Sequence, residues 1–207
     1  MRARGGASVV VATENAGKLA EISAILSDLP VELCSLSDFD PVDFPEEGGD
    51  YAVNAIAKAR AVAEELGSVA VADDSGLEVN ALDGAPGPYS ARYGGVDLSD
   101  DARVDHLLEN LEGVPGSRRA ARFVCVAALV TPDGDILGMR GECLGKILER
   151  PRGRSGFGYD PVFQPAGDER SMAELPAEEK NRVSHRGRAF RALLKAWLGP
   201  VEYDLTP

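Results

Sequence analysis

The sequence predicts an α/β fold, and three observations lead to this class. A short β-branched run at residues 8–13 is followed at once by a capped helical pattern. A second apolar run, at residues 69–72, has the length of a buried strand and stops at two carboxylates. Further on, apolar arms at 122–131 and 135–148 flank a Pro-Asp-Gly turn, which indicates a long hairpin in a sheet. Strands that alternate with helices are typical of α/β architecture.

Length and composition fit one globular domain. The chain has 207 residues, of which 44% are hydrophobic and 27% charged, and no apolar stretch is long enough to cross a bilayer. We expect a single domain over residues 1–207, with irregular termini at 1–7 and 200–207. The three cysteines lack metal-site spacing, and their odd number favours a reduced cytoplasmic location over a disulfide framework.

The charge balance limits the partners of the protein. A formal net charge of −12 argues against nucleic acid, because non-specific binding to it needs a basic face. An anionic small ligand needs only local positive charge. Seventeen arginines outnumber the lysines, so each lysine is of interest for its compact, mobile ammonium, which suits phosphate. The five lysines are Lys18, Lys58, Lys146, Lys180 and Lys195.

The first strand–helix junction is a candidate anion site. The segment TENAGK at 13–18 places Asn15 at the N-cap of a helix that we expect to run to about Asp28. Amides at a helix N-terminus point toward anions, and Lys18 adds a charge in the first turn. The segment is not a P-loop, because an apolar residue follows the Gly-Lys pair. A capped helix without a ligand is the alternative interpretation.

An acidic, proline-broken loop at 36–50 leads to the second helix. Glu47 directly precedes two glycines, which let the backbone approach a ligand closely. Asp50 is expected to cap a helix over 51–66 that presents Asn54 and Lys58 on one face, one turn apart. A solvated loop beside a lysine that reaches out to water would explain the same pattern.

Asp73 and Asp74 are the centre of the predicted site. We expect them to end a buried strand, and open α/β sheets bind their ligands at the carboxyl ends of strands. Two adjacent carboxylates there could hold a hard divalent cation or polarise a water molecule. The alternative is a plain turn, since Asp, Ser and Gly are also the residues with which a chain leaves a strand.

Two segments near the C-terminus point to a binding site. Phe157 stands between glycines. Its ring could fill a space in the hydrophobic core or serve as a platform on which a flat base stacks. His185 and Arg186 open the last helix, where cations are unfavourable unless an anion or acceptor lies opposite them. Before them, Ser99 is expected to cap a helix whose His106 lies on the surface, off the apolar stripe.

Five motifs, taken together and in order, resemble the inosine triphosphate pyrophosphatase family of house-cleaning dITP/XTP pyrophosphatases. The motifs are TENAGK (13–18), EEGG (46–49) with NAIAKAR (54–60), ADDSGLEV with GAPGPYSARYGG (72–95), FGYDPVF (157–163) and EEKNRVSHRG (178–187). One departure is Glu14, which places an extra negative charge near the expected triphosphate.

The resemblance implies an elongated fold of two lobes around a long twisted mixed β-sheet flanked by helices, with the active-site cleft between the lobes. It implies Mg²⁺-dependent hydrolysis of ITP, dITP or XTP to the nucleoside monophosphate and pyrophosphate by a cytoplasmic homodimer. Two alternatives use many of the same residues, namely a metal-dependent phosphatase acting on a small phosphoester and a non-enzymatic nucleotide sensor.

The resemblance also implies roles for individual residues. Asp74 would accept the proton of the attacking water, and Glu47, Asp74 and the adjacent Asp73 would bind Mg²⁺. Donors such as the Arg186 side chain would suit a six-keto oxygen and disfavour the amino group of adenine. Contacts with the substrate are implied for Thr13, Glu14, Asn15, Ala16, Gly17, Lys18, Lys58, Ser75, Phe157, Gly158, Tyr159, Asp160, Lys180, His185 and Arg186.

Overall fold

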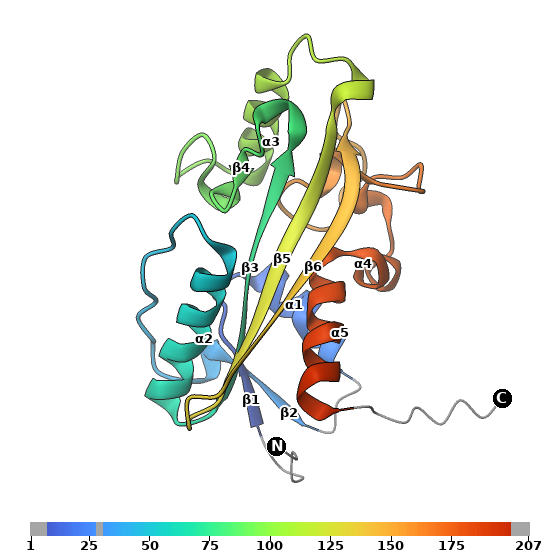
Figure 1. The fold of residues 1–207 in the computed structure, drawn as a ribbon. Helices are drawn as coiled ribbons and strands as arrows, with labels where there is room; N and C mark the ends of the chain where they lie inside the picture. The colour runs from blue at the N-terminus through green and yellow to red at the C-terminus, as the bar shows by residue number, and fades with distance from the viewer. Residues whose placement is uncertain (1–7, 28–30, 200–207) are drawn as a thin grey trace, which may run out of the picture.

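A computed structural model describes residues 8–27 and 31–199 of the chain. The termini expected to be irregular, 1–7 and 200–207, lie outside the described residues, as does the expected helix end near Asp28. The described chain forms a mixed seven-stranded sheet of order β2-β1-β3-β5-β6-β7, with β4 beside β3, flanked by helices (Figure 1). The predicted α/β class is therefore confirmed.

The strands fall into a parallel and an antiparallel group. β1 pairs in parallel with β2 and β3, whereas β4, β5, β6 and β7 join the sheet through antiparallel pairs. The predicted hairpin is the β5–β6 pair. The strands are β1 (Ser8–Val11), β2 (Glu32–Ser35), β3 (Val69–Val79), β4 (Pro86–Gly87), β5 (Ala120–Val130), β6 (Ile136–Ile147) and β7 (Phe163–Pro165).

The predicted helix caps Asn15, Asp50 and Ser99 are confirmed, and Ser184 caps the last helix in the same way. Asn15, Asp50, Ser99 and Ser184 each accept a hydrogen bond from a backbone amide in the first turn of the helix that follows. Such caps involve residues two or three positions apart, so they form without help from the rest of the chain. The helices are α1 (Ala16–Leu26), α2 (Tyr51–Leu66), α3 (Asp100–Asn110), α4 (Ala177–Val183) and α5 (His185–Leu198).

Helices cover both faces of the lower part of the sheet (Figure 1). α2 covers one face, and α1 and α5 cover the other. Alternate side chains of β5 supply the two interfaces, so Val126 and Ala128 pack under α2 while Cys125 and Ala127 pack under α5. β5 is buried on both faces, which explains its continuous apolar sequence.

A separate core lies in the upper part of the molecule. It contains Leu77 of β3, Phe123 of β5, Leu107 of α3 and Phe163 of β7, all buried. β3, β5 and β6 have 11, 11 and 12 residues, and each contributes to the upper core as well as to the lower part. The result is an elongated fold of two lobes joined by long strands (Figure 1).

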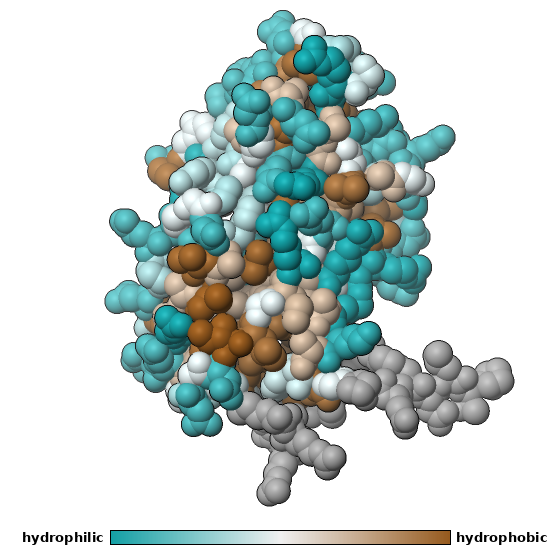
Figure 2. All heavy atoms as spheres, viewed as in Figure 1, coloured by the Kyte–Doolittle hydropathy of each residue, from teal (hydrophilic) through white to brown (hydrophobic). Residues whose placement is uncertain are grey.

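The exposed face of α2 carries an apolar patch. Figure 2 shows hydrophobic side chains gathered over α2 and the adjoining β5–β6 hairpin. Val53 on α2 is 63% exposed, and Ile136 at the start of β6 is 40% exposed. Within residues 8–27 and 31–199, none of the helices combines the length and the apolar character that crossing a membrane requires.

Candidate active site

Asp73 and Asp74 lie in the middle of β3, so the expectation that their strand ends at Ala72 is wrong. β3 continues because β5 pairs with it along its whole length. What ends at this point is the pairing with β1, whose last partner on β3 is Val71. β4 pairs with β3 only from Leu77 onward. Since β5 occupies one edge of β3, the acids lie in the gap between β1 and β4 along the other edge.

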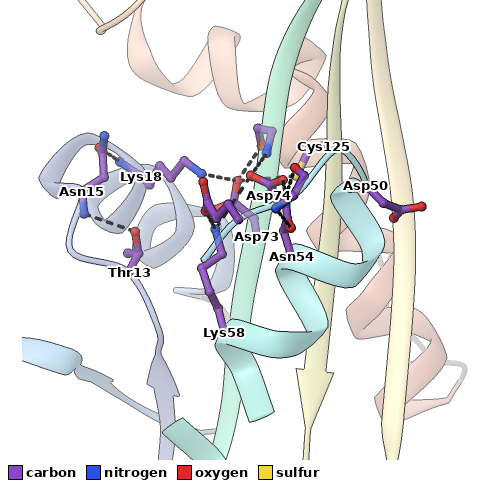
Figure 3. Close-up of polar contacts among 12 residues, drawn as sticks. Thr13, Asn15, Lys18, Asp50, Asn54, Lys58, Asp73, Asp74 and Cys125 are labelled. Atoms are coloured by element: carbon purple, nitrogen blue, oxygen red, sulfur yellow. Dashed lines mark hydrogen bonds and ion pairs between the residues drawn. The ribbon is translucent and has the colours of Figure 1, made fainter. Parts of the chain in front are cut away.

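The alternation of side chains along β3 separates the two acids. Successive side chains of a strand point to opposite faces of its sheet. Asp73 points to the face covered by α1 and α5, and Asp74 points to the face covered by α2. Figure 3 shows Lys18 of α1 reaching the pair from one side and Asn54 and Lys58 of α2 from the other. Each acid therefore has its own set of partners.

Asp73 is a buried anion held by cations. It is 2% exposed, and its Oδ2 lies 3.2 Å from Lys18 Nζ and 3.1 Å from Arg186 Nη2. The Ser75 hydroxyl also donates to this oxygen. Burial by itself would raise the pKa of Asp73, but Lys18 and Arg186 hold it well below its usual range. Asp73 thus stays ionised at neutral pH and anchors both cations.

Asp74 is the more basic of the two. Its Oδ2 accepts a hydrogen bond of 2.8 Å from Asn54 Nδ2, and its Oδ1 accepts one of 3.0 Å from the Ser75 amide. Burial raises the pKa of Asp74, and Lys58 and Asn54 offset only part of this effect. When neighbouring carboxyls have pKa values pushed apart, the more basic one is suited to accept a proton. Here that group is Asp74.

Lys58 joins the two carboxylates expected to bind metal. Its Nζ lies 2.6 Å from Glu47 Oε1 and 3.8 Å from Asp74 Oδ1. Carboxylate oxygens that converge on one positive charge are the donors that Mg²⁺ prefers. Asp73 fits this role less well, because its Oδ2 already binds Lys18 and a guanidinium.

The carboxylates do not form a complete metal cage. Among residues 8–27 and 31–199, no three His, Cys, Asp or Glu side chains cluster closely enough to hold an ion by themselves. Mg²⁺ is commonly held by one or two carboxylates together with water and substrate phosphates. The pair Glu47 and Asp74 therefore fits a Mg²⁺ ion that arrives with a nucleotide.

The turn before α1 is organised for an anion. Asn15 Oδ1 accepts from the Lys18 amide at 2.9 Å, and Thr13 Oγ1 accepts from the Asn15 amide at 3.2 Å. Lys18 extends from the first turn of α1 toward β3 (Figure 3). Glu14 is exposed, so water screens its charge.

A cleft between the lobes begins at this turn. The upper lobe contributes Ser90, Asp100 and Arg103 to its walls. The cleft joins the start of α1 to the glycine-rich loop and to the start of α5. The expected substrate-binding residues that line it are Asn15, Lys18, Ser75, Phe157, Gly158, Tyr159, Asp160, Lys180, His185 and Arg186.

Phe157 is a half-buried ring on the wall of this cleft. It packs against Gly17, where a Cβ atom would come within 2.5 Å of the ring. Lys180 Nζ lies 5.0 Å from the ring centroid and Arg186 Cζ lies 5.6 Å from it. Partial exposure beside two cations distinguishes Phe157 from the fully buried phenylalanines of the core. Tyr159, by contrast, is 5% exposed and donates to the Ser90 carbonyl, which ties the loop to the upper lobe.

His185 is a neutral imidazole at the cleft. It is 5% exposed and stacks on Phe123, with ring centroids 4.7 Å apart. Burial, reinforced by the adjacent Arg186, holds the pKa of His185 well below its usual 6.5. Its Nδ1 has no hydrogen-bond partner in the part of the chain that the structure describes. This nitrogen still needs a partner.

Four charged residues of the site were not predicted from the sequence: Asp100 and Arg103 of the cleft wall, Glu21 and Arg92. Glu21 of α1 forms ion pairs with Lys180 and Arg186, and it lies 2.7 Å from the Lys180 Nζ. Its spacing of three residues from Lys18 places both on one helix face, a signal that could have revealed it. Arg92 donates to the Glu47 carbonyl at 2.8 Å, 45 positions along the chain, and no local pattern indicates this contact.

Glu21 and Asp73 also explain why a cation, Arg186, occupies the start of α5, where the neutral His185 adds no charge. Arg186 is 2% exposed, and its guanidinium contacts both acids. The expected acceptor opposite the helix N-terminus is therefore present.

Comparison with known proteins supports the resemblance. A model of the Ham1 family matches residues 9–196. The dITP/XTP pyrophosphatase of Geobacter sulfurreducens is 54% identical over 194 residues, which cover 92% of this chain and 96% of that protein. The dITP/XTP pyrophosphatase of Streptomyces coelicolor is 48% identical over 90% of this chain and 94% of its own length.

Solved structures show the same fold. A HAM1 protein from Coxiella burnetii superimposes with a TM-score of 0.84 at 40% identity, covering 94% of this chain and all of its own. A nucleoside-triphosphatase / dITP/XTP pyrophosphatase from Mycobacterium abscessus has a TM-score of 0.70 at 46% identity, over 90% of this chain and 98% of that one.

Proposed function

The chain belongs to the Ham1 family, and we propose that it hydrolyses the non-standard purine nucleoside triphosphates ITP, dITP and XTP. The products are the nucleoside monophosphate and pyrophosphate. Removal of these nucleotides from the cellular pool is the corresponding biological role.

One observation carries this proposal. A single cleft joins a positively charged helix N-terminus at one end to an aromatic ring and a neutral imidazole at the other. Lys18 and the α1 amides suit phosphates, whereas Phe157 and His185 suit a flat base. The carboxylates of Asp73 and Asp74 lie beside the phosphate end. A nucleoside triphosphate has matching groups in this order.

The chain's own residues divide the work of hydrolysis. Lys18 and Lys58 neutralise phosphate oxygens and hold the chain of phosphates in place. Asp74 accepts the proton of the attacking water as the anhydride bond between the α and β phosphates breaks. Pyrophosphate leaves with the electrons of that bond. Asp73, whose Oδ2 contacts both Lys18 and Arg186, keeps Lys18 in position.

We infer that the enzyme uses Mg²⁺, held by Glu47 and Asp74 with Asp73 adjacent. When bound, the ion would supply charge neutralisation on the phosphate oxygens. The support for this inference is the convergence of Glu47 and Asp74 on the Lys58 ammonium.

Selectivity for keto purines needs hydrogen-bond donors near position six of the base. Arg186 has few donors to offer, because its Nε and Nη2 contact Asp73 and its Nη1 contacts Glu21. The second N–H of Nη2 contacts the Ser75 hydroxyl, so four of the five N–H groups are used and about one, on Nη1, is left for the base. The neutral His185 ring is the other candidate, since Nδ1 has no partner in the described part of the chain.

The apolar patch on α2 and the unpaired cysteines support two further proposals. A homodimer would cover exposed side chains such as Val53, and light scattering of the purified protein tests it.

Cys34, Cys125 and Cys143 are free thiols, which suits the reducing cytoplasm.

The test of the proposed function is incubation of the protein with Mg²⁺ and ITP, XTP, GTP or ATP. Nucleotide products are separated by chromatography, while pyrophosphate and orthophosphate are assayed separately. We expect monophosphate and pyrophosphate from ITP and XTP, with ATP and GTP nearly untouched. Orthophosphate as the product would favour a phosphatase, and binding without turnover would favour a nucleotide sensor.

A further inference from the structure

Asn54 is a buried amide whose hydrogen bonds link the loop before α2 to β3. The residue is 3% exposed and lies in the first turn of α2. Its Oδ1 accepts from the Gly48 amide at 2.8 Å, and its Nδ2 donates to the Gly48 carbonyl at 3.0 Å. The same Nδ2 donates to Asp74 Oδ2 at 2.8 Å (Figure 3).

These three bonds permit only one orientation of the amide. A carboxamide nitrogen carries two N–H donors, and both are used on acceptor oxygens. Rotation of the amide by half a turn would place the Asn54 oxygen against the Gly48 carbonyl and the Asp74 carboxylate. The oxygen atom of Asn54 would then face two other acceptor oxygens with no hydrogen atom between them. The side chain is therefore a rigid bridge between these two groups.

The bridge matters because of what lies at its two ends. Gly48 directly follows Glu47, and the chain over residues 39–50 has no helix or strand to hold it. Asp74, in contrast, is fixed in the pairing of β3 with β5. Asn54 thus connects the irregular loop, directly after Glu47, to Asp74 on the rigid strand.

We propose that Asn54 is a positioning residue that sets the placement of Glu47 relative to Asp74, so that both carboxylates serve one cation. This inference rests on the proposed function of the site. Asn54 holds the proton acceptor Asp74 through a direct hydrogen bond, and it holds Glu47 only through the neighbouring residue. It acts through Gly48, whose peptide group it holds at both the amide and the carbonyl.

Arg92 offers a useful comparison. Its Nη2 donates to the Glu47 carbonyl at 2.8 Å, and its Nη1 lies 3.5 Å from Glu47 Oε2. It approaches from the turn Ser90–Arg92 in the upper lobe and holds the loop from the other side of the cleft. Arg92 therefore restrains Glu47 directly, whereas Asn54 restrains it relative to Asp74.

The experiment uses the full-length protein with two substitutions at position 54. Asn54→Ala removes all three bonds and is compatible with the alanine-rich α2. Asn54→Asp keeps the size of the side chain and the acceptor for Gly48, but replaces the donor to Asp74 by an oxygen. Asn110→Ala is the matched control, because it makes the same change on α3, where the amide bonds to its own helix.

Two readouts separate positioning from mere folding. Calorimetric titration with Mn²⁺ of the protein saturated with a non-hydrolysable ITP analogue measures cation affinity without turnover, and kinetics with ITP at saturating Mg²⁺ give kcat and KM. Loss of an outer contact to a metal ligand typically costs about 10- to 100-fold in affinity or activity. We expect such a loss in Mn²⁺ affinity and in kcat for Asn54→Ala, and no loss in either for Asn110→Ala. For Asn54→Asp we expect the loss in kcat, whereas its added carboxylate attracts cations by itself and offsets the loss in Mn²⁺ affinity.

The KM for ITP at saturating Mg²⁺ should stay within about two-fold of the wild type, because other elements hold the nucleotide. Mn²⁺ affinity and kcat near wild-type values in folded Asn54→Ala would overturn the proposal, and so would a rise in KM alone. If wild-type protein does not release pyrophosphate, the proposed function fails instead. The Mn²⁺ titrations still decide the role of Asn54 in that case.

Discussion

Substitution of the two adjacent acids should separate stability from catalysis. Asp73→Asn removes the charge that faces Lys18 and Arg186, whereas Asp74→Asn removes the proton acceptor. Both changes keep the volume of the side chain. We expect the first variant to lose stability and the second to lose turnover while remaining folded.

The size of the stability loss in Asp73→Asn follows from the burial of Asp73 and Arg186. Asp73 and Arg186 are each 2% exposed, so removing the carboxylate leaves a guanidinium in the interior with Glu21 as its remaining acid. Breaking a buried ion pair by removing one partner costs about 3–5 kcal/mol. For a chain of this size each kcal/mol lowers Tm by about 2–4 °C. The expected loss for Asp73→Asn is therefore about 6–20 °C.

Asp74→Asn leaves less charge unbalanced, because Lys58 retains its 2.6 Å contact with Glu47. Its Tm should stay within a few degrees of the wild type, while kcat falls by at least the factor of about 100–10,000 that a general base supplies. Thermal unfolding followed by circular dichroism and a pyrophosphate assay measure the two effects. Equal Tm losses in both variants, or retained turnover in Asp74→Asn, would refute this division of roles.

Three further predictions concern the cleft. Lys18→Ala should raise KM for triphosphates by about 10- to 100-fold through the loss of a charge-assisted contact, and an unchanged KM in steady-state kinetics would contradict the placement of phosphates at α1. Phe157→Ala should weaken binding of all nucleotides by about 1–3 kcal/mol if the ring stacks on the base; calorimetry with a non-hydrolysable analogue checks this, and a loss confined to Tm would indicate a structural ring. Although burial opposes ionisation, Arg186 and Lys180 hold the pKa of Glu21 below its usual 4.5. The charge of Glu21 therefore stabilises the fold above about pH 4.5, and this stabilisation disappears as the pH falls through the lowered pKa. The stability difference between wild type and Glu21→Gln in urea titrations should thus be full at pH 7 and shrink in acid, and a difference that grows in acid would show the opposite sign.

Local signals in the sequence were sufficient for most helices and for the hairpin. The caps at Asn15, Asp50, Ser99 and Ser184 depend on residues two or three positions away. The hairpin depends on a turn and two apolar arms. The end of the strand at Ala72 was predicted wrongly, because polar residues within a strand look like a turn until the partner strand is known.

The sequence by itself therefore determined the family, the α/β class and the residue types of the site, since motifs and caps are written in short stretches of chain. Tertiary structure decided how those residues are paired. Arg186 meets Asp73 across 113 positions, and Arg92 meets Glu47 across 45. Such contacts depend on which strands are neighbours and which face each side chain takes. Alternation along β3 places Asp73 and Asp74 on opposite faces of the sheet. The two acids acquire different partners only because different helices cover those two faces in the folded protein.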